Sequence, residues 1–196
     1  MGSGMIHNRR TVHAICTLHR QWLPGDSRGW RSRQHRRHSS GDYRNPPPPE
    51  EHAGLRRWVN QRLTGDPKFL LPQQLGIVGS AFLFKLIKMQ CAVSILSCSA
   101  THLHVLYESR ADDAMIELGR AKQYSSYKLR HPSGRLWAAG GKIIRPNDQM
   151  HVENIFGYLD NHARKESAWV WRHDRDPLPS RDDIDALIAA LNQSRG

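Results

Sequence analysis

The segment from Pro72 to Met89 is the sequence feature that most restricts the fold of this chain. It has the length and spacing of a helix, and apolar residues occupy nearly all of its faces. A helix of this kind has to be covered on most sides by other parts of the protein. Its longest apolar run, Leu75 to Ile87, is interrupted by Lys85 and is shorter than the roughly 18 residues that cross a bilayer. We therefore expect a buried helix in a folded core and no membrane partner.

Strand patterns surround this helix in the sequence. Loose alternation of apolar residues predicts strands at Thr11–Leu18, at Cys91–Ser97, at Leu103–Tyr107 with the residues just before it, and at Leu136–Arg145, which contains a glycine bend. The strands are separated by helical segments rather than by short turns alone. This order predicts an α+β fold, with a mainly antiparallel central sheet and helices packed on it.

Three further helices are expected around the sheet. Leu55, Trp58, Val59 and Leu63 recur at helical spacing, and Trp58 is expected in the core. A second helix begins near Ser109 and ends in basic residues, as the helix dipole favours. A third, capped by Asn147 or Asp148, carries an apolar stripe through Leu159.

The composition divides the chain into three stretches. Residues 1–10 are expected to be a tail or an expression scar, and an expression scar would place the native start at Met5. Residues 11–171 are expected to form the main domain, which contains a basic, proline-rich loop at about 26–50. Residues 172–196 are a polar C-terminal tail with a short amphipathic helix, Ile184–Leu191. The three cysteines lack metal-type spacing, which fits a reducing cytoplasm.

The charge of the chain indicates a polyanionic partner. The net charge is +11, and residues 1–45 contribute +7 of it through nine arginines. Contacts to phosphates release counterions, so a basic surface of this kind favours nucleic acid. Within the basic loop, Arg33, Arg36 and Arg37 are candidate DNA contacts on an arm that becomes ordered on binding. A solvated loop is the alternative.

Two histidines with one residue between them are the first chemical motif. His102 and His104 lie on a predicted strand, where residues i and i+2 point to the same face of the sheet. Two imidazoles side by side can share a metal ion, while Leu103 points to the opposite face. Two unrelated surface histidines are the alternative, because the chain has twelve histidines.

A tyrosine and a third histidine are the second motif. Tyr158 and His162 are four residues apart on the last predicted core helix, and such residues are neighbours on one helix face. Both lie at the border of the apolar stripe, where side chains can reach over the edge of a sheet. A tyrosine that merely flanks the core is the alternative.

Together these motifs resemble the HUH-type tyrosine transposases, in particular the REP-associated enzymes that act on single-stranded hairpin DNA. The strand Thr101-His102-Leu103-His104-Val105-Leu106 is similar to the histidine–hydrophobe–histidine strand of the family. The segment Ile155 to His162 is similar to its late helix, which carries the nucleophilic tyrosine and a metal ligand four residues later. The segments around Trp22, Trp137 and Trp169 are also similar to segments of this family. The resemblance covers about Val12 to Trp171.

The resemblance implies a ferredoxin/RRM-like HUH nuclease core with the nucleophile on a late helix. His102, His104 and His162 would hold a divalent metal, Mg²⁺ or Mn²⁺, which polarises the scissile phosphate. Tyr158 would attack phosphorus, leaving a free 3′-OH and a 5′-phosphotyrosine that a 3′-OH can later reverse. The implied activity is cleavage and rejoining of single-stranded DNA in a bacterial cytoplasm.

The sequence departs from the family pattern at two positions. Thr101 stands where the family often has asparagine, and His162 stands where several relatives have glutamine. A third imidazole moves the preference of the site from Mg²⁺ toward Mn²⁺ or other transition ions. The identity of the metal therefore stays open at this point.

Further basic residues surround the predicted site in the sequence and are candidate DNA contacts. They are Lys122, Lys128, Arg130, Arg135, Lys142 and Arg145. The expected partner is single-stranded or hairpin DNA, and both a monomer and a homodimer are compatible with the resemblance. Two other functions remain as alternatives: a domesticated protein that binds hairpin DNA without cutting, and a metal-dependent nuclease that uses water.

Overall fold

The computed structural model describes residues 9–21, 23–30, 37–41, 45–63, 65–110, 114–130 and 134–194. Two compact units are present: one holds the residues up to Leu18 together with those from Phe69 onward, and the other holds residues 19–68. The elements of the first unit are β1 (Arg9–Thr17), α2 (Pro72–Lys88), β2 (Ala92–Cys98), β3 (His102–Arg110), α3 (Ala114–Leu129), β4 (Lys142–Ile144), α4 (Gln149–Asp160), α5 (His162–Lys165), β5 (Trp169–Arg172) and α6 (Arg181–Gln193).

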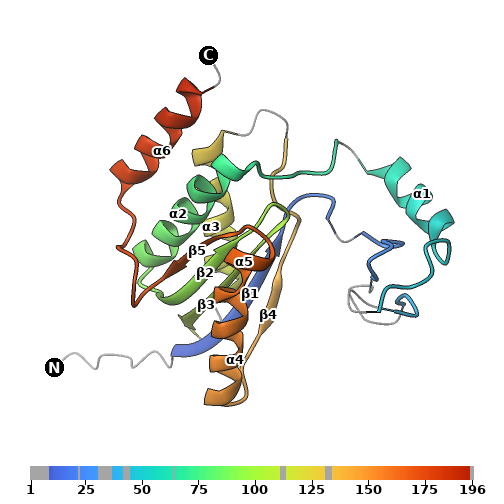
Figure 1. Cartoon of the computed structure of the whole chain (residues 1–196), viewed down its shortest axis with the longest axis horizontal. Coiled ribbons are helices and arrows are strands. Elements are labelled where there is room, and N and C mark those ends of the chain that lie inside the picture. The colour runs from blue at the N-terminus through green and yellow to red at the C-terminus, as the bar shows by residue number, and fades with distance from the viewer. Residues whose placement is uncertain are drawn as a thin grey trace. The chain divides into compact units, whose positions relative to one another are not determined.

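The first unit is built on one antiparallel sheet of five strands in the order β4-β1-β3-β2-β5 (Figure 1). β1 and β2 both pair antiparallel to β3, so they run parallel to each other with β3 between them. The chain passes from β1 to β2 through helix α2, which gives the split βαβ arrangement. The predicted α+β class, with an antiparallel sheet and helices packed on it, is confirmed.

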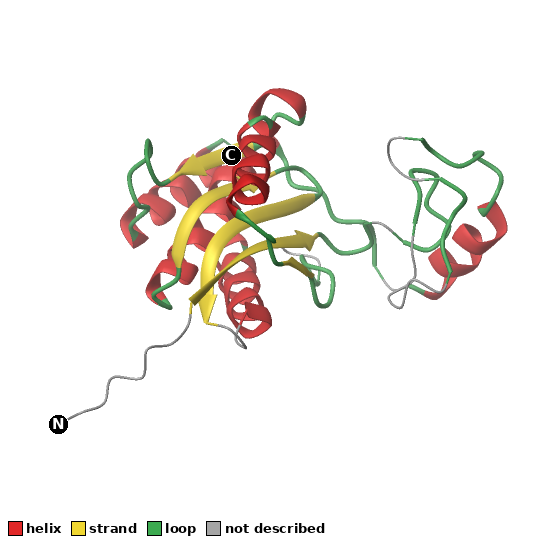
Figure 2. Ribbon diagram, turned by 90° about the horizontal axis from the view of Figure 1, so that it is seen from below, coloured by secondary structure: helices red, strands yellow, loops and turns green. Residues whose placement is uncertain are grey.

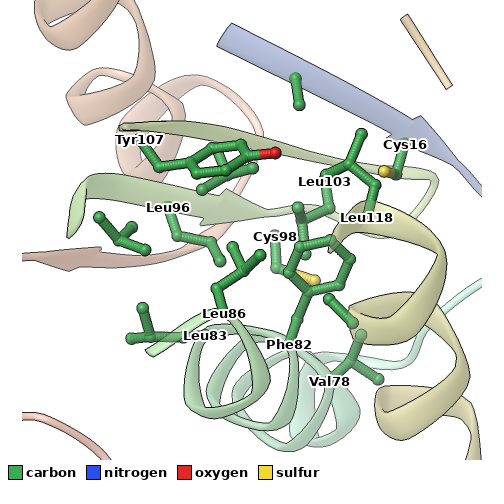
Figure 3. Packing of buried hydrophobic residues seen from close by; sticks show 14 of the residues in the cluster. Cys16, Val78, Phe82, Leu83, Leu86, Leu96, Cys98, Leu103, Tyr107 and Leu118 are labelled. Carbon is green, nitrogen blue, oxygen red and sulfur yellow. The ribbon is translucent and has the colours of Figure 1, made fainter. Parts of the chain in front are cut away.

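One face of the sheet packs against α2 and α3. Successive side chains of a strand point to opposite faces, so Leu103 and Tyr107 of β3 point to the same face. There they meet Val78, Phe82 and Leu86 of α2 in a single buried cluster (Figure 3). Pro72 opens α2 at its first position, where its missing N–H is not needed, and the Gln74 side chain accepts a hydrogen bond from the Leu71 N–H.

The other face of the sheet carries α4. Ile155 and Leu159 of α4 pack with Ile95 of β2 and Leu106 of β3 in a second, smaller buried cluster. The helices therefore lie on both sides of a twisted sheet (Figure 2). Since His102 and His104 alternate with core residues of β3, they point to the α4 side.

The segment predicted as one strand, Leu136–Arg145, forms a strand only at its end. Trp137 makes an isolated bridge to Leu18, and β4 is limited to Lys142–Ile144. Between them the Lys122 ammonium donates to the carbonyl oxygens of Ala138 and Gly140, both at 2.6 Å. Gly140 has a φ of +69°, which turns the chain away from the sheet. Because Lys122 binds these carbonyl oxygens, they are not used for pairing between strands, and β4 is shorter than predicted.

Two elements near the C-terminus differ from the expectation. β5 pairs with β2 along Trp169–Arg172, where no strand was predicted. The terminal helix α6 begins at Arg181, earlier than predicted, because the Ser180 hydroxyl caps it by accepting from the Asp183 N–H at 3.1 Å. Ile184 and Leu191 of α6 are buried, so this helix packs on the domain.

The unit of residues 19–68 contains helix α1 (Ala53–Arg62) and an internal ion-pair cluster. The buried carboxylate of Asp26 lies 2.7 Å from Arg28 Nη2 and 3.1 Å from Arg56 Nη1. Burial alone would raise the pKa of Asp26, but the hydrogen bonds and charge of Arg28, with the charge of Arg56, hold it below its usual range.

The expectation that Trp58 belongs to the core is wrong, because its side chain is 52% exposed. No residue of α1 is buried, so the helix that carries Trp58 is not packed into a core. The guanidinium of Arg62 lies over the Trp58 ring at 4.0 Å. Among the described residues, no helix combines the length and apolar character needed to cross a membrane.

The close packing of α2 against β5 can be tested at Gly79. A Cβ added there would lie 2.3 Å from the Trp169 ring, so Gly79→Ala should destabilise the protein by about 1–3 kcal/mol. Gly119 on α3 is the control, since an added Cβ meets nothing within 4 Å and should stabilise the helix by up to about 1 kcal/mol. Urea unfolding of both variants measures the difference, and equal effects would contradict the packing.

Candidate active site

Strand β3 places two histidines on the α4 side of the sheet. The rings of His102 and His104 have centroids 4.8 Å apart and lie edge to face. His104 is 5% exposed, and it pairs across the sheet with Ile15 of β1 and Ser97 of β2. The prediction that both imidazoles share one face is confirmed.

The third histidine comes from the chain that follows α4. We expected Tyr158 and His162 on one continuous helix, but α4 ends at Asp160 and His162 is the first residue of α5. Asn161 between them keeps a right-handed helical backbone, with φ −70° and ψ −12°, so the spacing of one helical turn is preserved. The His162 ring lies 5.0 Å from His104 and 6.0 Å from His102 between centroids.

These three histidines form a cluster that can hold a metal ion. One ligand nitrogen from each ring lies within 4.8 Å of the other two. Nitrogens in adjacent positions at about 2.1 Å from an ion lie about 3.0–3.4 Å apart, so metal binding would draw the rings together slightly.

Each ring of the cluster has its Nδ1 atom occupied by a neighbour. The Ser97 hydroxyl lies 3.0 Å from His162 Nδ1, and His13 Nε2 lies 2.8 Å from His104 Nδ1. The hydroxyls of Ser99 and Thr101 lie 3.0 and 2.9 Å from His102 Nδ1. Partners of this kind fix the tautomer and orientation of metal-binding imidazoles and leave Nε2 as the ligand atom.

The Nε2 atom of His162 supports this assignment. It is buried and has no hydrogen-bond partner among the residues that the structure describes. A buried polar atom without a partner is costly, and coordination of a cation would remove that cost. The donor set therefore fits a divalent metal ion.

The electrostatics keep the buried imidazoles neutral. Burial, followed by the neighbouring His102, His13 and His162, lowers the pKa of His104 to about 2. Burial, followed by the charges of His162, Lys142 and His151, lowers the pKa of His13 to about 4. Both rings are thus uncharged at neutral pH, which is the form that binds metal.

Tyr158 borders the cluster on its exposed side. Its ring lies 4.5 Å from His162 and 5.8 Å from His104 between centroids, and both contacts are edge to face. The side chain is 45% exposed. A phenol in this position is next to any ion held by the histidines and can also be reached from solvent.

Two residues of the site were not identified from the sequence. His13 is buried on β1, and its ring lies edge to edge with the ring of His104, with centroids 5.1 Å apart and an angle of 24° between the ring planes. Glu166 lies one turn after His162, with Oε2 3.5 Å from His102 Nε2 and Oε1 4.0 Å from His162 Nε2. The spacing of Glu166 from His162 was a usable signal, because it repeats the spacing of Tyr158 to His162.

Two of the predicted DNA contacts are occupied inside the protein. Lys122 is buried and holds the 138–140 segment, and Lys128 is buried in an ion pair with Asp185. The ammonium groups of these two lysines bind groups of the protein itself and are not available at the surface for direct contact with DNA.

The remaining predicted contacts lie in different places. Lys142 is exposed and lies opposite Ile15 of β1, which in turn lies opposite His104 of β3. The other exposed residues are Arg130, Arg135 and Arg145 in this unit and Arg37 in the unit of residues 19–68. Arg33 and Arg36 lie outside the described residues. The structure thus places Lys142 in register with Ile15, which is in register with His104.

Comparison with family models, with curated proteins and with solved structures gives no match for this chain.

The histidine cluster predicts stabilisation by metal. Mn²⁺ at about 100 times its dissociation constant should raise the melting temperature by about 5–10 °C, because it binds only the folded chain. Differential scanning calorimetry with and without a chelator measures the shift. His162→Ala should remove the shift, and the shift rather than the absolute melting temperature is compared because His162 is buried. An unchanged shift would contradict the site.

His13 should act through His104. His13→Phe keeps a ring but removes the acceptor for His104 Nδ1, so it should lower Mn²⁺ affinity by about 10- to 100-fold. His13→Gln retains a side-chain acceptor and should lower the affinity less. Isothermal titration with Mn²⁺ compares the two, and equal losses would show that His13 contributes only packing.

Proposed function

We propose that this chain is a metal-dependent, single-strand DNA endonuclease and transposase whose nucleophile is Tyr158. The observation that carries the proposal is the contact of an exposed tyrosine with two of three clustered histidines. The split βαβ sheet is compatible with the ferredoxin-like core of the HUH nucleases, and His102 and His104 lie on its central strand.

The reaction transfers a phosphoryl group from DNA to the protein. The Tyr158 oxygen forms a bond to phosphorus, the bond from phosphorus to the 3′-oxygen breaks, and the phenolic proton ends on that 3′-oxygen. The products are a free 3′-OH and a 5′-phosphotyrosine, and attack by a 3′-OH reverses the step. A divalent ion at the histidines would supply Lewis-acid polarisation of the phosphate.

The residues of the chain supply position and charge. Ser97, Ser99, Thr101 and His13 orient the rings, so the ligands are held before DNA binds. Lys142, in the same row of the sheet as His104, is placed to contact a DNA phosphate. α4 packs on the sheet of the same chain, which puts Tyr158 beside His104 of that chain.

The substrate class rests on the charge and on the family resemblance. A net charge of +11 favours a polyanion, and the REP-associated transposases act on single-stranded hairpin DNA. We propose hairpin DNA in a bacterial cytoplasm as the setting of the reaction.

The test uses hairpin oligonucleotides labelled at the 5′ or the 3′ end, with Mn²⁺ or Mg²⁺, on denaturing gels. The wild type should give a protein–DNA adduct that carries the 3′ label and disappears on chelation. Tyr158→Phe should abolish it, since this variant lacks the nucleophilic oxygen. Tyr127→Phe is the matched control, because Tyr127 is also exposed but lies on α3.

Other outcomes would replace the proposal. Metal-dependent cutting that persists in Tyr158→Phe without an adduct would indicate a nuclease that uses water. Binding of hairpins without any cutting would indicate a recognition protein.

A further inference from the structure

We propose that Glu166 is a fourth protein ligand of the metal ion, which makes the site a three-histidine, one-carboxylate centre selective for Mn²⁺ over Mg²⁺. This inference rests on the metal site of the proposed function and deepens it. Neither the histidine–hydrophobe–histidine motif nor the tyrosine motif includes this residue.

The carboxylate of Glu166 is shared between two of the three rings. Its Oε2 lies 3.5 Å from His102 Nε2, and its Oε1 lies 4.0 Å from His162 Nε2. Both nitrogens are the atoms left for a ligand once Nδ1 is occupied. His162 Nε2 has no hydrogen-bond partner among the described residues, so the carboxylate faces that atom without bonding it. An ion between them would satisfy both groups.

The backbone holds Glu166 in this position. Its N–H donates to the His162 carbonyl at 2.9 Å, which ends α5 one turn after the histidine. Ser167 then adopts a φ of +51°, in the left-handed region, and the Ala168 N–H also points to the His162 carbonyl at 3.4 Å. The chain turns immediately after Glu166, and its side chain is directed toward His102.

Glu166 and Tyr158 lie on opposite sides of His162. Tyr158 is four residues before it and contacts His104, whereas Glu166 is four residues after it and approaches His102. A carboxylate bound on the His102 side leaves the Tyr158 side of the ion open. Four protein ligands would leave two positions of an octahedron for water or for a phosphate.

The donor set determines which ion binds. Imidazole nitrogens suit transition ions, and a carboxylate suits Mn²⁺ as well as Mg²⁺. Mg²⁺ is bound in proteins through one or two carboxylates while it keeps several waters, which three imidazoles do not favour. The single negative charge of Glu166 also attracts a dication into a cluster of otherwise neutral ligands.

The test measures Mn²⁺ binding to the full-length protein without DNA, from the electron paramagnetic resonance signal of free Mn²⁺. Glu166→Gln should weaken Mn²⁺ binding by at least about 10- to 100-fold, the loss typical of an outer-shell partner. Binding of Co²⁺ adds an absorption spectrum whose intensity and position change with the number of ligands. Mg²⁺ should compete with Mn²⁺ poorly in the wild type and relatively better in Glu166→Gln.

Glu153→Gln is the matched control. Glu153 is an exposed glutamate of α4 whose carboxylate accepts from Gln149 Nε2 at 3.1 Å, about 13 Å along the helical path from His162. The Glu153→Gln substitution removes the same charge as Glu166→Gln and should leave Mn²⁺ affinity and the Co²⁺ spectrum unchanged. Circular dichroism verifies that both variants are folded.

The outcomes separate this inference from the proposed function. If the wild type binds Mn²⁺ and Glu166→Gln binds it equally well with the same Co²⁺ spectrum, Glu166 is not a ligand, while the histidine site stands. If the wild type and His104→Ala both fail to bind Mn²⁺ or Co²⁺, the histidine site and the Glu166 inference are both overturned.

Discussion

The antiparallel pairing of β3 with β1 on one side and β2 on the other determines both the core and the site. Because the side chains of a strand alternate, one face of β3 delivers Leu103, Val105 and Tyr107 to the main core. The same alternation places His102 and His104 on the opposite face, beside α4. A shift of register by one residue would turn the histidines into the main core and the apolar residues toward α4, so the hydrophobic core itself fixes the direction of the histidines.

The neighbouring strands then complete the surroundings of the histidines. β2 contributes the Ser97 hydroxyl to His162, and the turn after β2 contributes the Ser99 hydroxyl to His102. β1 contributes His13, whose Nε2 atom lies 2.8 Å from His104 Nδ1. The two hydroxyls and the neutral ring of His13 carry no negative charge, so they orient the imidazoles without competing for a cation. The rigid sheet therefore supplies what a flexible loop could not, a set of ligands held in place before metal binds.

The sequence predicted those parts of the site that depend on local spacing. His102 with His104 follows from the two-residue period of a strand, and Tyr158 with His162 follows from the helical turn. His13 could not be assigned, because its role depends on which strands are neighbours in the sheet, and that order is not encoded locally. β5 was missed because its four residues are too few to show alternation. The prediction of a strand over residues 136–141 was wrong because the conformation of this segment depends on Lys122, which is distant in the sequence. The Lys122 ammonium binds carbonyl oxygens that strand pairing would otherwise use.

The unit of residues 19–68 interrupts the split βαβ motif without disturbing the sheet, because both of its ends are fixed at one place. The Leu18 N–H donates to the Thr101 carbonyl, and the Leu70 N–H donates to the Ala100 carbonyl. Within the inserted unit, the Lys68 N–H donates to the His19 carbonyl, so its first and last residues are adjacent. Closing a long insertion costs little more than closing a short one once the ends meet. The insertion carries eleven lysines and arginines against five acidic residues, which is +6 of the net charge of +11. Leu18 and Leu70, the residues that flank the insertion, therefore both hydrogen-bond to the turn that leads directly into His102, so the chain enters and leaves the basic insertion beside the histidine motif.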